Sequence, residues 1–205
     1  MPAILAKKLG MTQRFMEDGR VERVTVLEAG PCPVTAVRTD DVDGYTAVQL
    51  GFGSVREKAL TKPELGHLKK VSAPPVRTLV EFRDEAGELT VGDTVTVEAF
   101  EVGDQVKIAG KSKGKGFQGT IKRHRFAAGP KSHGSHNVRA PGSIGASATP
   151  SRVFKGRKMP GQMGNTRVTQ KGLTVVELIP ADNLMLVRGA VPGSKGQTVE
   201  VRTDG

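Results

Sequence analysis

Two glycine-rich stretches carry the residue types that enzymes use to bind phosphate. Gly110-Lys111-Ser112 matches the end of a phosphate loop, in which backbone amides surround a triphosphate and the lysine reaches its terminal phosphates. The glycine that should stand five positions earlier is Gln105, and Lys-Gly-Lys-Gly follows where an apolar helix should begin. A flexible basic loop is therefore favoured over a nucleotide-binding enzyme.

The second stretch, residues 114–119, has the G-x-G-x-x-G spacing of a dinucleotide-binding turn. Such a site needs an acidic residue about 20 positions later to bind the ribose hydroxyls. The next acid is Glu177, and no His-Arg-Asp or Asp-Phe-Gly element of a protein kinase follows. This stretch therefore indicates neither a dinucleotide site nor a kinase loop, and no cofactor is expected.

The histidines and the single cysteine form no recognisable metal or nucleophile pattern. His133 and His136, with His124 nearby, have no cysteine or carboxylate within 28 residues on either side, whereas zinc takes three or four ligands. We expect these histidines to donate to phosphate or to stack on bases. Cys32 lies between two prolines, and a buried apolar role beside a turn is favoured for it. No metal site and no intramolecular disulfide are expected.

The distribution of charge is more informative than these motifs. The chain of 205 residues has 31 Lys and Arg against 21 Asp and Glu, a net charge of +10. Residues 105–176 contain no acid, although an even spread would put roughly seven there, and they hold 15 basic residues. The remaining 133 residues carry 16 basic and 21 acidic side chains, a net of −5. A solubilising surface normally mixes charge signs, so the basic segment predicts a polyanionic partner.

The basic segment is also poor in core-forming residues, because residues 110–165 contain only seven Leu, Ile, Val or Phe. Glycine and proline recur throughout it, which predicts an irregular, extended path. This character favours RNA over DNA, since a DNA reader more often presents a helix or ribbon to the major groove. We therefore predict an RNA-binding loop at 110–167, inserted in a body formed by 1–109 and 168–205.

The predicted RNA-contacting side chains are Lys111, Lys113, Lys115, Lys122, Arg123, His124, Arg125, Lys131, His133, His136, Arg139, Arg152, Lys155, Arg157, Lys158 and Arg167. The residues predicted to let RNA approach closely are Gly114, Gly116, Gly119, Gly134, Gly142, Ser143, Gly145, Gly156 and Gly161.

The body must hold both ends of this loop, and its sequence predicts mainly β structure with little helix. Short β-branched runs alternate with turn residues, as in an antiparallel barrel or sandwich. The runs are 21–29, 33–39, 45–52, 76–82, 93–100, 173–179, 184–191 and 198–203. Two Gly-Asp pairs, at 92–93 and 103–104, predict tight turns that enter strands. Helix is expected only near 62–70 and 116–124.

The sequence predicts neither export nor a membrane-spanning helix. No run of 18 or more apolar residues occurs, so no transmembrane helix is expected. Lys7 and Lys8 come too early for the apolar core of a signal peptide. A cytosolic location is therefore expected.

Several blocks of the sequence, taken in order, resemble one family. They are ILAKKLGMTQRF, GKSKGKGFQGTIKRHRF, GPKSHGS followed by APGSIG, TPSRVFKGRKMPGQMGNTRVT and NLMLVRGAVPG. The chain resembles, nearly end to end, the bacterial-type members of the universal family of the third protein of the large ribosomal subunit. The ordered set of blocks is far more specific than any single glycine motif.

The resemblance implies a translation-factor-like antiparallel β-barrel and an extension, roughly 111–167, that runs through 23S ribosomal RNA toward the peptidyl transferase centre. The tip would lie near residues 141–145. It implies a structural constituent of the cytoplasmic ribosome with an early role in assembly, and no enzymatic activity. The implied partners are 23S rRNA and neighbouring large-subunit proteins, with no membrane and no small-molecule substrate.

At two places the sequence departs from the family pattern, so the family's properties there are not expected for this chain. Ala146 and Ala148 stand where family members often have glutamine, one of which is methylated in some bacteria, so this modification is not expected here. His124 stands where the family often has tryptophan, which weakens the expectation of a large aromatic stack. Two alternative functions stay open: a free RNA chaperone, and a nucleotide-binding RNA-modifying enzyme that uses residues 110–119.

Overall fold

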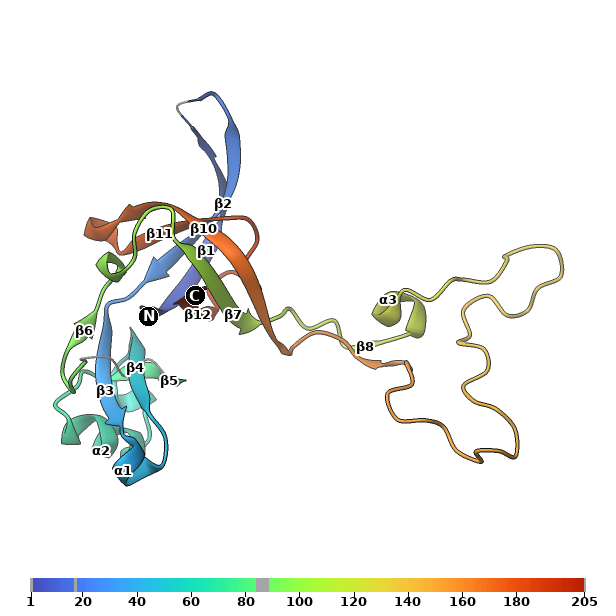
Figure 1. Cartoon of the computed structure of the whole chain (residues 1–205), viewed down its shortest axis with the longest axis horizontal. Coiled ribbons are helices and arrows are strands. Elements are labelled where there is room, and N and C mark those ends of the chain that lie inside the picture. Colours follow the sequence, from blue (N-terminus) through green and yellow to red (C-terminus); the bar gives the residue numbers. More distant parts are fainter. Residues whose placement is uncertain (1, 17, 84–88, 205) are drawn as a thin grey trace. The chain divides into compact units, whose positions relative to one another are not determined.

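The computed structural model describes residues 2–16, 18–83 and 89–204. The chain divides into two compact units: residues 1–111 with 167–205, called unit 1, and residues 112–166, called unit 2. Unit 1 contains the labelled barrel strands of Figure 1, and unit 2 contains β8 (Phe117–Gln118), α3 (Thr120–His124) and β9 (Gly161–Gln162). Each unit is described separately below.

A closed antiparallel barrel forms the centre of unit 1. Its strands are β1 (Ala3–Phe15), β2 (Val21–Ala29), β7 (Gln105–Lys111), β10 (Arg167–Ile179), β11 (Leu184–Arg188) and β12 (Thr198–Thr203). They follow the order β1-β12-β7-β10-β11-β2, and the first and last of these pair to close the ring. The prediction of a mainly β fold with an antiparallel barrel is confirmed.

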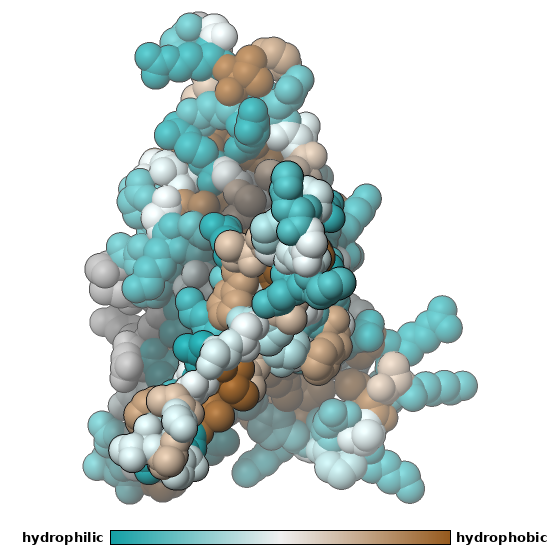
Figure 2. All heavy atoms as spheres, turned by 90° about the vertical axis from the view of Figure 1, so that its right-hand side faces the viewer, coloured by the Kyte–Doolittle hydropathy of each residue, from teal (hydrophilic) through white to brown (hydrophobic). Residues whose placement is uncertain are grey.

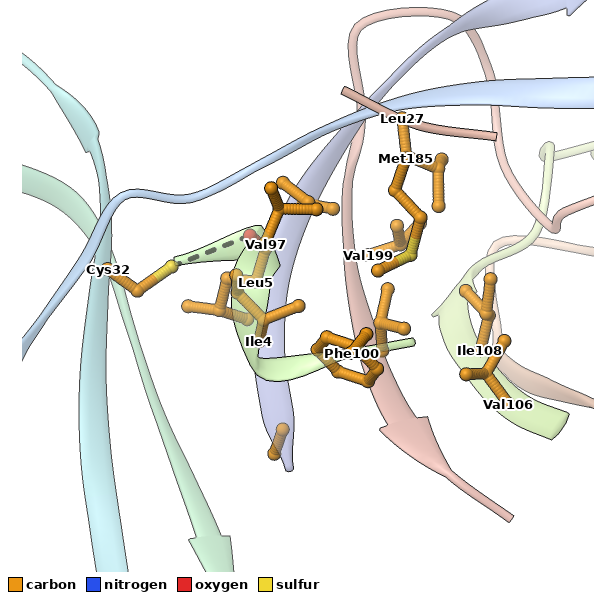
Figure 3. Close-up of a cluster of buried hydrophobic side chains, with 14 of the residues drawn as sticks. Ile4, Leu5, Leu27, Cys32, Val97, Phe100, Val106, Ile108, Met185 and Val199 are labelled. Atoms are coloured by element: carbon orange, nitrogen blue, oxygen red, sulfur yellow. Dashed lines mark hydrogen bonds between the residues drawn. The ribbon is translucent and has the colours of Figure 1, made fainter. Parts of the chain in front are cut away.

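The barrel core is made by side chains that alternate along each strand. Val106 and Ile108 of β7 are fully buried, and Val201 of β12 lies directly opposite Ile108. Figure 3 shows Val97 and Phe100 among the buried side chains of β1, β2, β7, β11 and β12. Each of these large side chains contributes about 1.5–3 kcal/mol when it leaves water, so the alternating apolar positions stabilise the closed ring.

A second antiparallel sheet of unit 1 has the order β5-β4-β3-β6. Its strands are β3 (Cys32–Arg38), β4 (Ala47–Ser54), β5 (Val76–Arg83) and β6 (Thr94–Val95). The short helix α1 (Asp40–Asp43) joins β3 to β4, and η1 (Glu57–Ala59) and α2 (Lys62–Lys70) join β4 to β5. The sequence indicated these strands but not that they form a sheet separate from the barrel.

Helix α2 begins where its sequence provides a capping box. Glu64 accepts hydrogen bonds from the backbone N–H and the hydroxyl of Thr61, both at 2.8 Å, which satisfies donors at the helix start. Pro63 occupies the first turn, and Leu68 packs its side chain into the protein. The helix predicted at 62–70 is confirmed.

Both predicted Gly-Asp turns are present. Gly92 and Gly103 each have a φ of +101°, which strongly favours glycine, and the following carboxylates accept from backbone N–H groups of Thr90 and Glu101. A strand was expected over residues 93–100, but only the two-residue β6 forms, and the turn η2 (Val97–Ala99) follows it. The strand ends there because the side chains of Val97 and Phe100 pack into the barrel core. The turn η3 (Pro180–Asp182) joins β10 to β11.

The surface is largely hydrophilic in the view of Figure 2, with hydrophobic atoms at the end of the β1–β2 hairpin at its top. Met11, Phe15 and Val21 are the exposed apolar residues of that hairpin. Among the described residues, no helix is both long and apolar enough to cross a membrane.

Candidate nucleic-acid interface

Unit 2 presents exposed cations that have no carboxylate in their own segment. Residues 112–166 contain eleven Lys and Arg and no Asp or Glu. Most of the predicted contact residues of this unit are exposed: Lys113, Lys115, Lys122, Arg125, Lys131, His133, His136, Arg139, Arg152, Lys155, Arg157 and Lys158. Without internal ion pairs, these cations depend on solvent counterions or on the phosphates of a partner.

The two ends of unit 2 run side by side and form a closed stem, defined here as residues 112–126 and 159–166. Ser112 donates its backbone N–H to the Thr166 carbonyl at 2.9 Å, and Asn165 donates to the Ser112 carbonyl at 3.1 Å. Lys115 and Met163 continue the ladder, followed by the paired strands β8 (Phe117–Gln118) and β9 (Gly161–Gln162). Backbone hydrogen bonds therefore join the two sides of the stem along this ladder.

Gly164 is a position where the two sides of the stem lie too close for a side chain. A Cβ atom built there would lie 2.1 Å from the Lys113 carbonyl oxygen, and the φ of +71° is itself unfavourable for other residues. Gly129 is a similar case, because its Cβ would lie 2.0 Å from the Asn137 carbonyl oxygen. The sequence analysis did not single out these two glycines, whose role is close packing of backbone on backbone.

Five of the glycines predicted to let RNA approach have open surroundings. A Cβ built at Gly116, Gly119, Gly134, Gly142 or Gly156 would meet no atom of the chain within 4 Å. Space beside these backbones is thus available to a partner. Their close approach to RNA stays a prediction.

Arg123 and His124 differ from the exposed cations. They lie at the end of α3 (Thr120–His124), half-buried, and both donate to the Met159 carbonyl, from Arg123 Nη1 at 2.6 Å and from His124 Nε2 at 3.1 Å. The Arg123 guanidinium also lies beside Gly161, where a Cβ would be 2.9 Å from Nη1. These two side chains hold the stem closed, a role that the sequence analysis did not identify. Arg123 keeps further N–H groups with which a phosphate could be bound.

Beyond the stem, residues 127–158 follow an irregular path with local closures. Gly129 donates its N–H to the Val138 carbonyl at 2.9 Å and closes a loop that carries Lys131, His133 and His136. Nearer the tip, Arg157 Nη2 donates to the Ser143 carbonyl at 2.6 Å. The tip therefore has some internal structure without a hydrophobic core.

The phosphate-loop match does not form a phosphate loop. Gly110 and Lys111 are the last residues of β7, where Gly110 lies in register with Val168 on one side and Val199 on the other. A Cβ at Gly110 would lie 2.9 Å from Val199 Cγ1, so this glycine allows tight packing inside the barrel. The backbone around Gly110 lies within a paired ladder and cannot wrap a triphosphate.

Other candidate chemistry is also missing from the described part of the chain. Within residues 2–16, 18–83 and 89–204, no group of three or more His, Cys, Asp or Glu could hold a metal ion. The Cys32 side chain is fully buried, and burial raises the pKa of its thiol to about 12. The apolar role predicted for Cys32 is confirmed.

Comparisons with known proteins agree with the resemblance in the sequence. A family model described as ribosomal protein L3 matches residues 70–181. The large ribosomal subunit protein uL3 of Gloeobacter violaceus is 57% identical over 195 residues, which cover 94% of this chain and 91% of the relative. The uL3 protein of Acidothermus cellulolyticus is 55% identical over 98% of this chain and 91% of its own length. That of Pelobacter propionicus is 54% identical over 97% and 96%, respectively.

Proposed function

Since this chain belongs to the ribosomal protein L3 family, we propose that it is a structural component of the large ribosomal subunit and that unit 2 binds the RNA of that subunit. The chain is not an enzyme, and its place is in the ribosome, in the cytoplasm. Its RNA partner would be 23S rRNA, together with neighbouring proteins of the large subunit.

The observation that carries the proposal is the set of exposed, unpaired cations on unit 2. Each phosphate bound by Lys or Arg releases condensed counterions, so the affinity falls with salt by about 0.7–0.9 log units per contact for each tenfold rise in salt concentration. A segment without a hydrophobic core also gains structure when it is packed between RNA helices. Unit 2 would thereby neutralise phosphates that otherwise repel each other during assembly.

We further propose that the tip near residues 141–145 extends toward the peptidyl transferase centre and that the chain acts early in subunit assembly. The family resemblance supports this, as do the open backbones at Gly142 and Gly156. Catalysis of peptide transfer would belong to the RNA, and the tip would influence its geometry.

The proposal is tested by removing charge from unit 2 in the full chain. The test variant replaces six exposed cations by glutamine, and these are Lys113, Lys115, Lys131, Arg139, Lys155 and Lys158. The matched control removes the same charge from exposed positions of unit 1, which are Arg56, Lys58, Lys62, Lys69, Lys70 and Lys195. Binding to transcribed 23S rRNA is measured against salt, and incorporation into subunits is measured on sucrose gradients.

For the unit 2 variant, we expect the slope of log affinity against log salt concentration to fall by several units. This variant should also no longer cosediment with large subunits, whereas the control variant should keep the wild-type slope and cosediment. Equal behaviour of the two variants would contradict the proposal. A wild-type chain that binds RNA but never cosediments stoichiometrically with subunits would favour the free RNA chaperone instead.

A further inference from the structure

The outer part of strand β1 is paired on one side only. Strand β12 pairs with β1 from Ala3 to Lys7, and Lys8 bonds to the loop before β12. From Met11 to Phe15, β1 pairs with β2 alone. Figure 1 shows this end of the β1–β2 hairpin beyond the other barrel strands. The unpaired side of residues 11–15 is called the free edge.

The hydrogen-bond pattern of the hairpin shows which backbone groups point to the free edge. Met16 donates its N–H to the Arg20 carbonyl at 2.9 Å. Bonded positions alternate along an antiparallel pair, so every second residue before Met16 also bonds to β2. The residues between them direct their N–H and C=O groups to the free edge, and these are Met11, Gln13 and Phe15. In the part of the chain that the structure describes, these groups have no backbone partner.

The free edge lacks the features that protect exposed strand edges. Proteins usually protect such an edge with proline, with charged residues or by keeping the strand short. Residues 11–15 contain no proline, and their one charged side chain, Arg14, is held by Glu177 at 3.0 Å. Outward N–H and C=O groups that recur about every 6.7 Å match the backbone of another β-strand, and RNA has no such backbone.

Apolar side chains beside the free edge are exposed on one face of the hairpin. Phe15 and Val21 lie directly opposite each other and are 67% and 51% exposed, and Met11, on the same face, is 53% exposed. Single exposed apolar residues are ordinary, whereas a group of them on one face marks an interaction site. A strand added at the free edge would place its own side chains beside Met11 and Phe15.

A hollow and an unpaired cation indicate which side chains such a strand would carry. The hollow, of about 510 Å³, is lined in part by Phe15, Met16 and Val176. Arg23 lies opposite Gln13 and is exposed, and among the described residues no carboxylate pairs with it. An apolar side chain fits the hollow, and an acidic one would neutralise Arg23.

We propose that the free edge binds an extended segment of a neighbouring protein of the large subunit as an additional β-strand. The segment alternates apolar and acidic residues. A second copy of this chain fits less well, because its own residues 11–15 contain no acid for Arg23. The inference rests on the structural role in the large subunit proposed above, and it adds a surface and a mode of binding.

The first test measures amide hydrogen exchange, residue by residue, in the free full chain and in purified large subunits. The amides of Met11, Gln13 and Phe15 should exchange fast in the free chain and about a hundredfold slower or more in the subunit. The amides of Thr12 and Arg14 bond to β2 in both states and serve as the internal reference. Edge amides that stay fast in the subunit would overturn the inference.

The second test uses two substitutions at one position. Gln13→Pro removes an outward N–H, and proline is tolerated in an edge strand, whereas Gln13→Thr changes the side chain and keeps the N–H. Each variant competes with tagged wild type during reconstitution of large subunits from their extracted RNA and proteins. The proline variant should be incorporated about fivefold less, and the threonine variant like the wild type. Equal incorporation of the two variants would count against the inference.

The exchange measurement also checks the fold of the proline variant. The amides of Thr12 and Arg14 should stay slow in it, since their bonds to β2 are intact. If they become fast, the hairpin itself is disrupted, and the exchange rates of the wild type decide.

A benzophenone-bearing amino acid in place of Gln13 then identifies what covers the free edge in the subunit. A photo-crosslink to another subunit protein, together with slow edge amides, supports the inference. A crosslink only to RNA, or to a second copy of this chain, would overturn it and leave the proposed function standing. A wild-type chain that never enters large subunits would overturn both.

Discussion

At the scale of single residues, a potentially reactive thiol and a charged lysine are both buried, and both stabilise the fold. Cys32 donates weakly from its Sγ to the Leu5 carbonyl at 3.5 Å inside the core (Figure 3). Lys8 is buried and donates from its Nζ to the carbonyls of Val191 and Gly193 at 2.6 and 3.2 Å. A lysine can bury its stem when its ammonium finds such acceptors, and a pattern of residue types does not reveal them.

Cys32 should be unreactive in the native chain. Desolvation by burial raises the pKa of its thiol to about 12, so almost no thiolate forms at pH 8. We expect no labelling by a disulfide reagent at pH 8 until denaturant unfolds unit 1, when one thiol per chain should react. Rapid labelling without denaturant would contradict this account of the core.

Gly164→Ala should open the stem of unit 2. Its Cβ would collide with the Lys113 carbonyl, in addition to the strain of a left-handed alanine of about 1–2 kcal/mol. Gly156→Ala is a matched control, because its φ of +81° gives the same strain but its surroundings are open. Trypsin cleavage after Lys113 and Lys115 should become about tenfold faster or more in the first variant only. Similar rates for both variants would show that the contact at Gly164 does not hold the stem.

At the scale of elements, hydrogen bonds at the start of helix α2 stabilise its first turn. The carboxylate of Glu64 caps α2, and the backbone N–H and then the hydroxyl of Thr61 hold its pKa below the ordinary value. A carboxyl group whose pKa is depressed by folding stabilises the folded state above its unfolded pKa, and this contribution is lost as the pH falls through the folded pKa.

Glu64→Gln should therefore lower the thermal midpoint of unit 1 at pH 7. The difference from wild type should shrink as the pH falls below about 4.5, because the wild-type carboxylate then becomes protonated. Calorimetry between pH 7 and 3 measures this difference. Glu57→Gln, in the exposed turn η1, serves as the control and should show no comparable trend. A Glu64→Gln difference that stays constant with pH would contradict the capping role.

Arg123 should act as a positioning residue for unit 2. Arg123→Gln removes the donor to the Met159 carbonyl, whereas Lys122→Gln removes the same charge from an exposed neighbour. In the free protein, amide hydrogen exchange at Lys115 and Met163 should become faster in the first variant and stay unchanged in the second. Equal exchange rates in the two variants would contradict the positioning role and would mean that only the charge of Arg123 matters.

The sequence predicted the helices and strands that are specified by patterns of neighbouring residues. Alternating β-branched residues predicted β2, β5 and β12, and the Thr61 to Glu64 spacing is typical of the start of α2. Strand β1 was not predicted, because Lys7 and Lys8 interrupt its apolar pattern and a register shift follows Lys8. The stem was not predicted either. It is formed by backbone hydrogen bonds between residues about 50 positions apart, and such bonds require no periodic pattern of side-chain types.

At the scale of the whole molecule, both ends of unit 2 join the barrel at positions that face each other. Lys111 and Arg167 are register partners at the ends of β7 and β10. Replacing residues 112–166 by a two-residue Asn-Gly turn should therefore leave the barrel intact, since such a turn joins paired antiparallel strands.

We expect this deletion variant to unfold cooperatively in denaturant and to show the near-UV signal of a packed core. Its affinity for 23S rRNA should fall by several orders of magnitude at physiological salt, because unit 2 supplies eleven of the cations. A variant that is soluble but lacks cooperative unfolding would show that the barrel depends on unit 2.

The closure of the barrel also sets the order in which the chain can fold. Ala3 of β1 pairs with Arg202 of β12, so the first strand must wait for the last before the ring is complete. Pairing over such long sequence separations makes folding slow. During translation, β1 and β2 can form a hairpin early, but the ring cannot close until β12 has left the exit tunnel. Unit 2 is synthesised before that point, so its cations leave the tunnel while the barrel that anchors them is still open.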